Sequence, residues 1–109
     1  VVWAHAGAYP CPALLRDSLA RYPRLYADLS MRDARIAPEG RLDPQWEWLL
    51  MEHPERFMVG VDTFSTGRWR AYGHHAGRIR AWLARLPPGV ARQLARDTAR
   101  AVYAGAAGR

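Results

Sequence analysis

The hydrophobic positions of this chain fall into three short apolar runs. The first, Val1 to Ala4, leads into His5, the second spans Leu25 to Leu29, and the third, Phe57 to Val61, ends at Asp62. Apolar runs of about four to six residues bounded by polar or turn-forming residues are typical of buried β-strands. The pattern therefore predicts strands near residues 1–5, 25–30 and 57–62.

Between these runs lie segments whose apolar residues have helical spacing. Apolar positions recur at helical intervals between Leu14 and Tyr22, which predicts an amphipathic helix that ends before Pro23. Asp43-Pro44 is a favourable helix start, with Asp as N-cap and Pro in the first turn, and His53-Pro54 ends that helix. The polar segment from Met31 to Leu42 contains a proline and a glycine, so it is predicted to be a long loop at the mouth of a pocket.

The last part of the chain is predicted to be helical. From Gly67 onward the apolar residues fall at alternating three- and four-residue steps, which predicts one strong amphipathic helix. Pro87-Pro88-Gly89 ends it, and a final helix begins near Val90 and frays into residues 105–109. This alternation of strands and helices predicts an α/β fold with parallel strands in a single unit, residues 1–109.

Composition narrows the class of protein. Half of the 109 residues are hydrophobic, yet no run approaches the ~20 apolar residues of a membrane span. The net charge of +6 comes entirely from arginines scattered over the helical segments, which favours solvated helix faces over a nucleic-acid surface. Cys11 is the only cysteine, so no internal disulfide is expected, and a cytoplasmic location fits. We expect no membrane and no nucleic-acid partner.

Two side chains that can bind metal stand at the ends of predicted strands. His5 follows the first apolar run and Asp62 follows the third. Parallel strands bring their carboxyl ends to one edge of a sheet, where reactive residues of barrel enzymes are found. Asp28 and Arg32 are further candidates for substrate binding, because Asp28 lies in the second run and Arg32 begins the loop, where it could clamp a carboxylate. The pair His74-His75 lies within a helix and is expected to face solvent.

Three stretches resemble the C-terminal part of a metal-dependent amidohydrolase of the amidohydrolase-related family. They run from Val1 to Gly7, from Arg21 to Ser30 and from Pro54 to Phe64. The resemblance implies the last third of a (β/α)8 barrel, with His5 after the sixth strand and Asp62 after the eighth. The family's His-x-His pair and fifth-strand histidine have no counterpart here, so the chain is interpreted as a C-terminal fragment. Asp97-Thr98-Ala99 departs from the family's usual Gly-Asn-Ala turn.

The same resemblance implies a function. His5 and Asp62 would be catalytic residues and ligands of a divalent metal, with zinc expected and manganese or iron as alternatives. The metal would activate water to attack a carbonyl-type carbon of a small-molecule substrate. A related metal-dependent decarboxylase, or a catalytically silent α/β fragment that serves as an interaction module, are the alternatives. The resemblance also allows a homo-oligomer of a longer parent protein.

Overall fold

Three short parallel strands form the sheet of the computed structural model, which describes residues 1–107. The strands are β1 (Val2–Trp3), β2 (Tyr26–Asp28) and β3 (Phe57–Met58), in the order β1-β2-β3. Val2 pairs with Tyr26, and Ala27 pairs with Phe57. The predicted α/β class and parallel order are confirmed, and the strands are shorter than predicted. Beyond β3, for example, the Val59 N–H bonds to the Leu94 carbonyl and not to the neighbouring strand.

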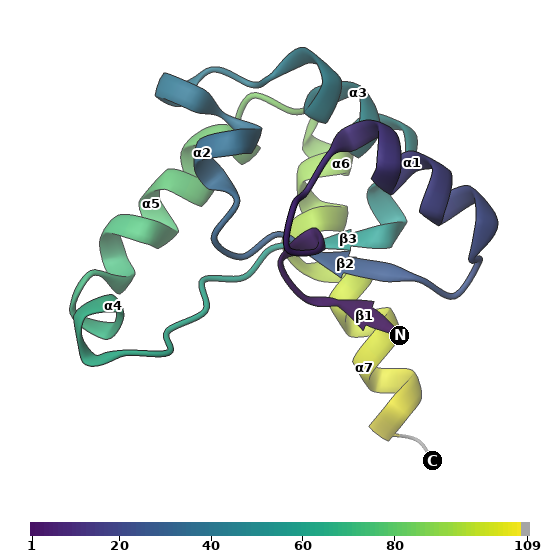
Figure 1. Cartoon of the computed structure of the whole chain (residues 1–109). Helices are drawn as coiled ribbons and strands as arrows, with labels where there is room; N and C mark the ends of the chain where they lie inside the picture. The colour runs from purple at the N-terminus through teal and green to yellow at the C-terminus, as the bar shows by residue number, and fades with distance from the viewer. Residues whose placement is uncertain (108–109) are drawn as a thin grey trace.

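Helices follow each strand and enclose the core (Figure 1). After β1 comes α1 (Pro12–Arg21), which ends before Pro23 as predicted, and after β2 comes α3 (Pro44–Glu52). The Asp43 carboxylate caps α3 by accepting hydrogen bonds from the backbone N–H groups of Gln45 and Trp46. Short 3₁₀ turns lie at Ala4–Ala6, Pro38–Gly40 and Pro54–Arg56.

Two predictions about the helices are wrong. The segment predicted to be a loop contains a short helix, α2 (Asp33–Ile36), whose buried Asp33 carboxylate accepts a hydrogen bond from the Trp82 indole nitrogen at 2.8 Å. The single helix predicted from Gly67 is two helices, α4 (Thr66–Arg70) and α5 (Tyr72–Leu83), separated at Ala71. The Asp33–Trp82 contact joins residues far apart in the sequence, so local periodicity does not reveal it.

The C-terminal helices include one wide turn. Helix α6 (Pro88–Arg92) begins at the predicted break, passes into a π-helical turn at Gln93–Asp97 and continues as α7 (Thr98–Ala107). Such a turn displaces a carbonyl from the usual helical ladder, and the Leu94 carbonyl accepts a hydrogen bond from the Val59 N–H at 3.1 Å. Helix α7 therefore reaches into the segment predicted to fray, whose last two residues, 108 and 109, lie outside the described residues.

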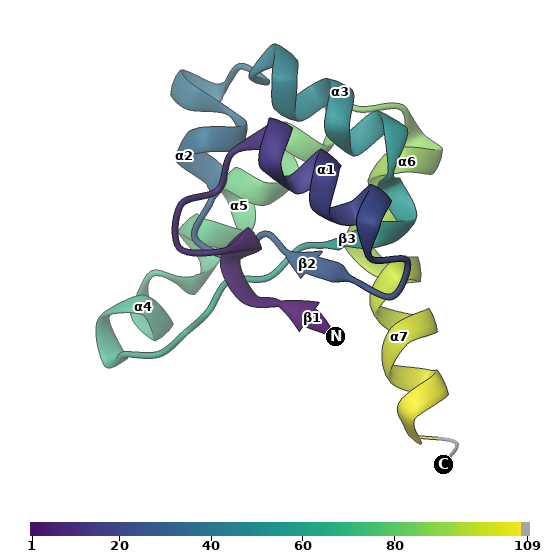
Figure 2. The ribbon, with the colours of Figure 1, turned by 45° about the vertical axis from the view of Figure 1, so that its right-hand side comes forward.

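The two faces of the sheet differ. Trp3, Ala27 and Phe57 share the face that packs on the apolar core, and Figure 2 shows α1 and α3 over that side. The other face carries Tyr26 and Asp28, both only partly buried. The largest fully buried apolar side chains are Leu15, Leu19, Leu29, Ile36, Leu49, Leu50, Phe57 and Leu94. Within residues 1–107 no helix is long and apolar enough to cross a membrane.

Candidate functional site at the carboxyl ends of the strands

Left-handed backbone conformations gather just beyond the strands. His5 and Ala6 follow β1 with φ of 58° and 52°, Met31 follows β2 with φ of 66°, and Asp62 follows β3 with φ of 58°. A non-glycine residue in this region costs about 1–2 kcal/mol, although His and Asp tolerate it better than most residues. Strain of this kind concentrates at functional sites, where the surrounding structure holds it in place.

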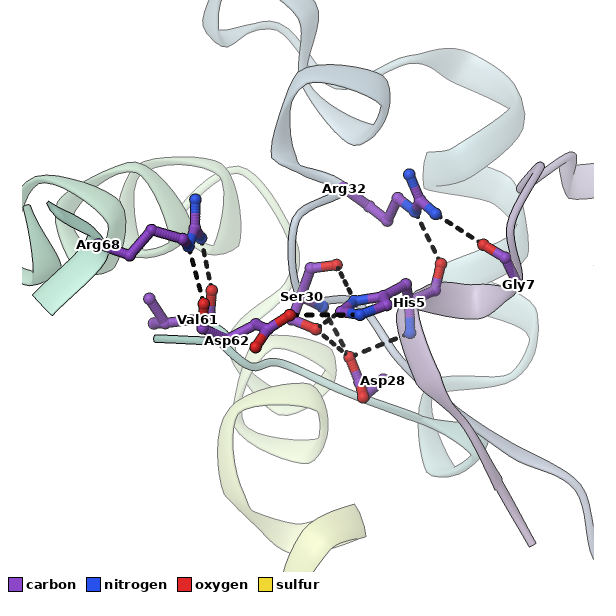
Figure 3. Close-up of polar contacts among 8 residues, drawn as sticks. All are labelled: His5, Gly7, Asp28, Ser30, Arg32, Val61, Asp62 and Arg68. Atoms are coloured by element: carbon purple, nitrogen blue, oxygen red, sulfur yellow. Dashed lines mark hydrogen bonds and ion pairs between the residues drawn. The ribbon is translucent and has the colours of Figure 1, made fainter. Parts of the chain in front are cut away.

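In two of these turns, one arginine guanidinium bridges two backbone carbonyls, a contact that we call an arginine staple. The guanidinium of Arg32 donates from Nε to the His5 carbonyl at 2.7 Å and from Nη2 to the Gly7 carbonyl at 2.6 Å. Arg68 donates in the same way, from Nε to the Asp62 carbonyl at 2.8 Å and from Nη2 to the Val61 carbonyl (Figure 3). Each arginine therefore supplies hydrogen-bond donors to two backbone carbonyls at its turn.

The turns bring His5 and Asp62 together. Nε2 of His5 lies 3.3 Å from Oδ2 of Asp62, and the two side chains are 35% and 31% exposed. The prediction that they lie at one edge of the sheet is thus confirmed, and both side chains face a common space. That space is an open pocket of about 410 Å³, lined also by Asp28, Ser30 and Gly60.

Asp28 and Ser30 hold the other side of the His5 ring. Nδ1 of His5 lies 2.8 Å from the Ser30 hydroxyl oxygen and 3.1 Å from the Ser30 carbonyl oxygen. The Ser30 hydroxyl donates to Oδ1 of Asp28, which also accepts from the Ser30 N–H at 2.9 Å and from the His5 N–H at 3.4 Å. Figure 3 shows these bonds converging on the ring and on one carboxylate oxygen.

The sequence candidates are therefore placed as follows. His5, Asp28 and Asp62 line one pocket, whereas the Arg32 guanidinium is committed to two backbone carbonyls. Binding of substrate by Asp28 and Arg32 stays a prediction. His74 and His75 lie in α5 and do not line this pocket, and His74 is exposed, as expected, whereas His75 is partly buried.

Ser30 and Arg68 were missed at the sequence level. Ser30 stands two residues after Asp28, and the two-residue period of extended chain could have placed both on one side. Arg68 carries no sequence signal that separates it from the other arginines. It also lowers the pKa of His75, for which burial is the larger cause.

Two candidate ligands alone do not make a catalytic metal centre. In residues 1–107 no group of three or more His, Cys, Asp or Glu side chains is arranged to hold a metal ion. Comparison of the chain with protein-family models, curated proteins and solved structures found no match. The fold and the site geometry show a small α/β unit with a pocket at its strand ends, which His5, Asp28, Ser30 and Asp62 line in part.

Proposed function

We propose that this chain is the C-terminal part of a metal-dependent hydrolase of the amidohydrolase-related kind, a partial (β/α)8 barrel in which His5 and Asp62 are two of the metal ligands. The observation that carries the proposal is the approach of His5 Nε2 and Asp62 Oδ2 to 3.3 Å, from the ends of two strands that are separated by a third. The sequence resemblance assigns the same two residues.

The donor set fits a divalent ion such as zinc. An imidazole nitrogen and a carboxylate oxygen are common zinc ligands, with bond lengths near 2.0–2.2 Å. Two ligands on a tetrahedral ion with such bonds lie about 3.4 Å apart, close to the separation of these two atoms. Manganese or iron could take the same ligands. A third and fourth ligand would come from a longer parent protein or from solvent.

Each residue of the pocket has a distinct task in this proposal. When bound, the metal would lower the pKa of water enough for it to attack a carbonyl carbon at neutral pH. His5 and Asp62 would hold the metal. Oδ1 of Asp62 has no hydrogen-bond partner among residues 1–107 and would accept the proton that the attacking water loses. Arg32 and Arg68 keep the two ligand-bearing turns in their strained conformations.

An activity assay tests the proposal. The 109-residue chain alone, given Zn²⁺ or Mn²⁺ and simple amide, ester and carboxylic-acid substrates, should show no appreciable turnover, because two protein ligands can bind a metal but do not complete a catalytic centre. A longer parent that also supplies the family's His-x-His pair should turn over one of these substrate classes. There Asp62→Asn should abolish most activity and leave folding intact, while Asp17→Asn on α1 serves as the matched control.

Two results would contradict the proposal. Robust turnover by a monomer of the 109-residue chain would show a complete enzyme. Full activity of a longer parent carrying Asp62→Asn would remove Asp62 from the chemistry. Release of carbon dioxide, in place of hydrolysis products, would identify the related decarboxylase.

A further inference from the structure

The polar groups around His5 favour one position for the proton of its ring. Nδ1 lies 3.1 Å from the Ser30 carbonyl oxygen, an atom that can only accept. The Ser30 hydroxyl gives its own proton to the Asp28 carboxylate, so toward Nδ1 it presents a lone pair. Both neighbours of Nδ1 are then acceptors, and both are satisfied when Nδ1 carries the hydrogen.

The opposite assignment brings acceptors into contact. If Nδ1 were unprotonated and took the hydroxyl proton of Ser30, its lone pair would face the Ser30 carbonyl. The Ser30 hydroxyl oxygen would also face Oδ1 of Asp28 with no hydrogen between them. Ser30 is only 4% exposed, so water has little access to relieve these contacts. This arrangement gains a hydrogen bond from Nε2–H to Oδ2 of Asp62 at the open pocket wall, but its two unfavourable contacts lie in a part-buried place, so it is disfavoured.

With Nδ1 protonated, the neutral ring directs a lone pair from Nε2 toward Oδ2 of Asp62. These two acceptors lie 3.3 Å apart at the pocket wall. Their proximity is favourable when a cation or a proton lies between them. A metal-binding histidine typically donates its other N–H to a carbonyl or carboxylate, which fixes the ring's tautomer and orientation. The Ser30 carbonyl and the link from Ser30 to Asp28 provide that outer partner.

We infer that Ser30 and Asp28 are positioning residues that keep a proton on Nδ1 of His5 and so make Nε2 the atom that binds the metal. This inference rests on the proposed function for the metal, but the position of the proton can be measured without any metal. It also excludes Ser30 as a nucleophile activated by His5, although the order Ser30, His5, Asp62 looks like a Ser-His-Asp triad.

Solid-state NMR of the chain labelled with ¹⁵N-histidine tests the proton position. This method reads ring nitrogens whether or not the chain self-associates, and His5→Gln identifies the His5 signals among the four histidines. We expect a protonated Nδ1 without metal and with Zn²⁺, and a Zn²⁺-dependent shift of Nε2. An unprotonated Nδ1, or labelling of Ser30 by a fluorophosphonate, would overturn the inference. Failure of Zn²⁺ to shift either nitrogen would instead overturn the metal site.

Variants separate positioning from a purely structural role. Ser30→Ala should give a mixture of the two ring tautomers and weaken Zn²⁺ binding about tenfold, as loss of an outer partner typically does. Ser30→Thr keeps the hydroxyl and should restore both readouts. Ser18→Ala, on α1, is the matched control and should change neither. If Ser30→Ala lowers stability but leaves the tautomer and the Zn²⁺ affinity unchanged, Ser30 is structural only and the inference fails.

Discussion

The turns that follow β1 and β3 are built alike in their backbone, but only the first turn also holds the side chain of its metal-competent residue in place. Each puts a metal-competent residue in a left-handed conformation, and each is stapled by an arginine through two carbonyls. After β1 the side chain is fixed as well, because Ser30 holds the His5 ring from Nδ1. After β3 the Asp62 carboxylate has, among residues 1–107, only His5 Nε2 as a polar side-chain partner.

This difference suggests how the site works. In the proposed metal site, His5 would be the pre-organised ligand, and Asp62 would be the one whose carboxylate adjusts to a cation and exchanges a proton. A site that must bind a metal and also move a proton benefits from one rigid and one adaptable group. Changes in the first turn should therefore affect folding most, and changes at the Asp62 carboxylate should affect metal binding most.

The largest expected effect on stability is in the first turn. Gly7 has φ of 91° and ψ of 169°, and a Cβ there would lie 2.7 Å from the Trp3 ring. The conformation is nearly restricted to glycine, so Gly7→Ala should lower the free energy of unfolding by about 2–5 kcal/mol through strain and overlap. Urea unfolding measures this.

A second glycine provides the control for that measurement. Gly77 lies inside α5 with no atom within 4 Å of its would-be Cβ. Gly77→Ala should raise the free energy of unfolding by about 0.5–1 kcal/mol. An equal response to both substitutions would show that the first turn has no special constraint.

The arginine staples should have similar, intermediate effects. Arg32→Met and Arg68→Met each leave two carbonyls without their charged donor, which should cost about 1.5–3 kcal/mol of stability. Arg70→Met, at an exposed position of α4, should change stability by less than about 0.5 kcal/mol. Thermal and urea unfolding of the three variants compare them directly. Staples no more costly to remove than Arg70 would mean that the turns hold their shape unaided.

The smallest expected effect concerns His75. The positive charge of Arg68 contributes to a lowered His75 pKa, after burial. Arg68→Met should therefore move the His75 pKa upward, toward its ordinary value, and an NMR titration of that ring would show the change. A downward shift would contradict the placement of Arg68 near α5.

The helix ends that prolines and a capping residue determine were predicted correctly from the sequence. Pro23, Asp43 and Pro54 fix helix ends whatever surrounds them, so α1 and α3 were predicted well. The π-helical turn depends on a distant partner, the Val59 N–H, which the spacing of residues 93–97 does not reveal.

The candidate site divides in the same way. The ends of apolar runs pointed to His5 and Asp62, because parallel strands bring their carboxyl ends together. The roles of Arg32 and Arg68 required the strained turns to be seen, since a half-buried arginine that caps carbonyls has the same sequence pattern as one on a solvated helix face. The structural roles of these two arginines therefore cannot be recognised from an arginine-rich sequence.

Zinc binding tests the central claim most directly. Calorimetric titration of the chain with Zn²⁺ should show one site whose affinity falls at least about tenfold in both His5→Gln and Asp62→Asn. His74→Gln removes a histidine from α5 and should leave the affinity unchanged. If Asp62→Asn binds Zn²⁺ as tightly as the unchanged chain, or if His74→Gln abolishes binding, then the two strand ends do not form the metal site proposed here.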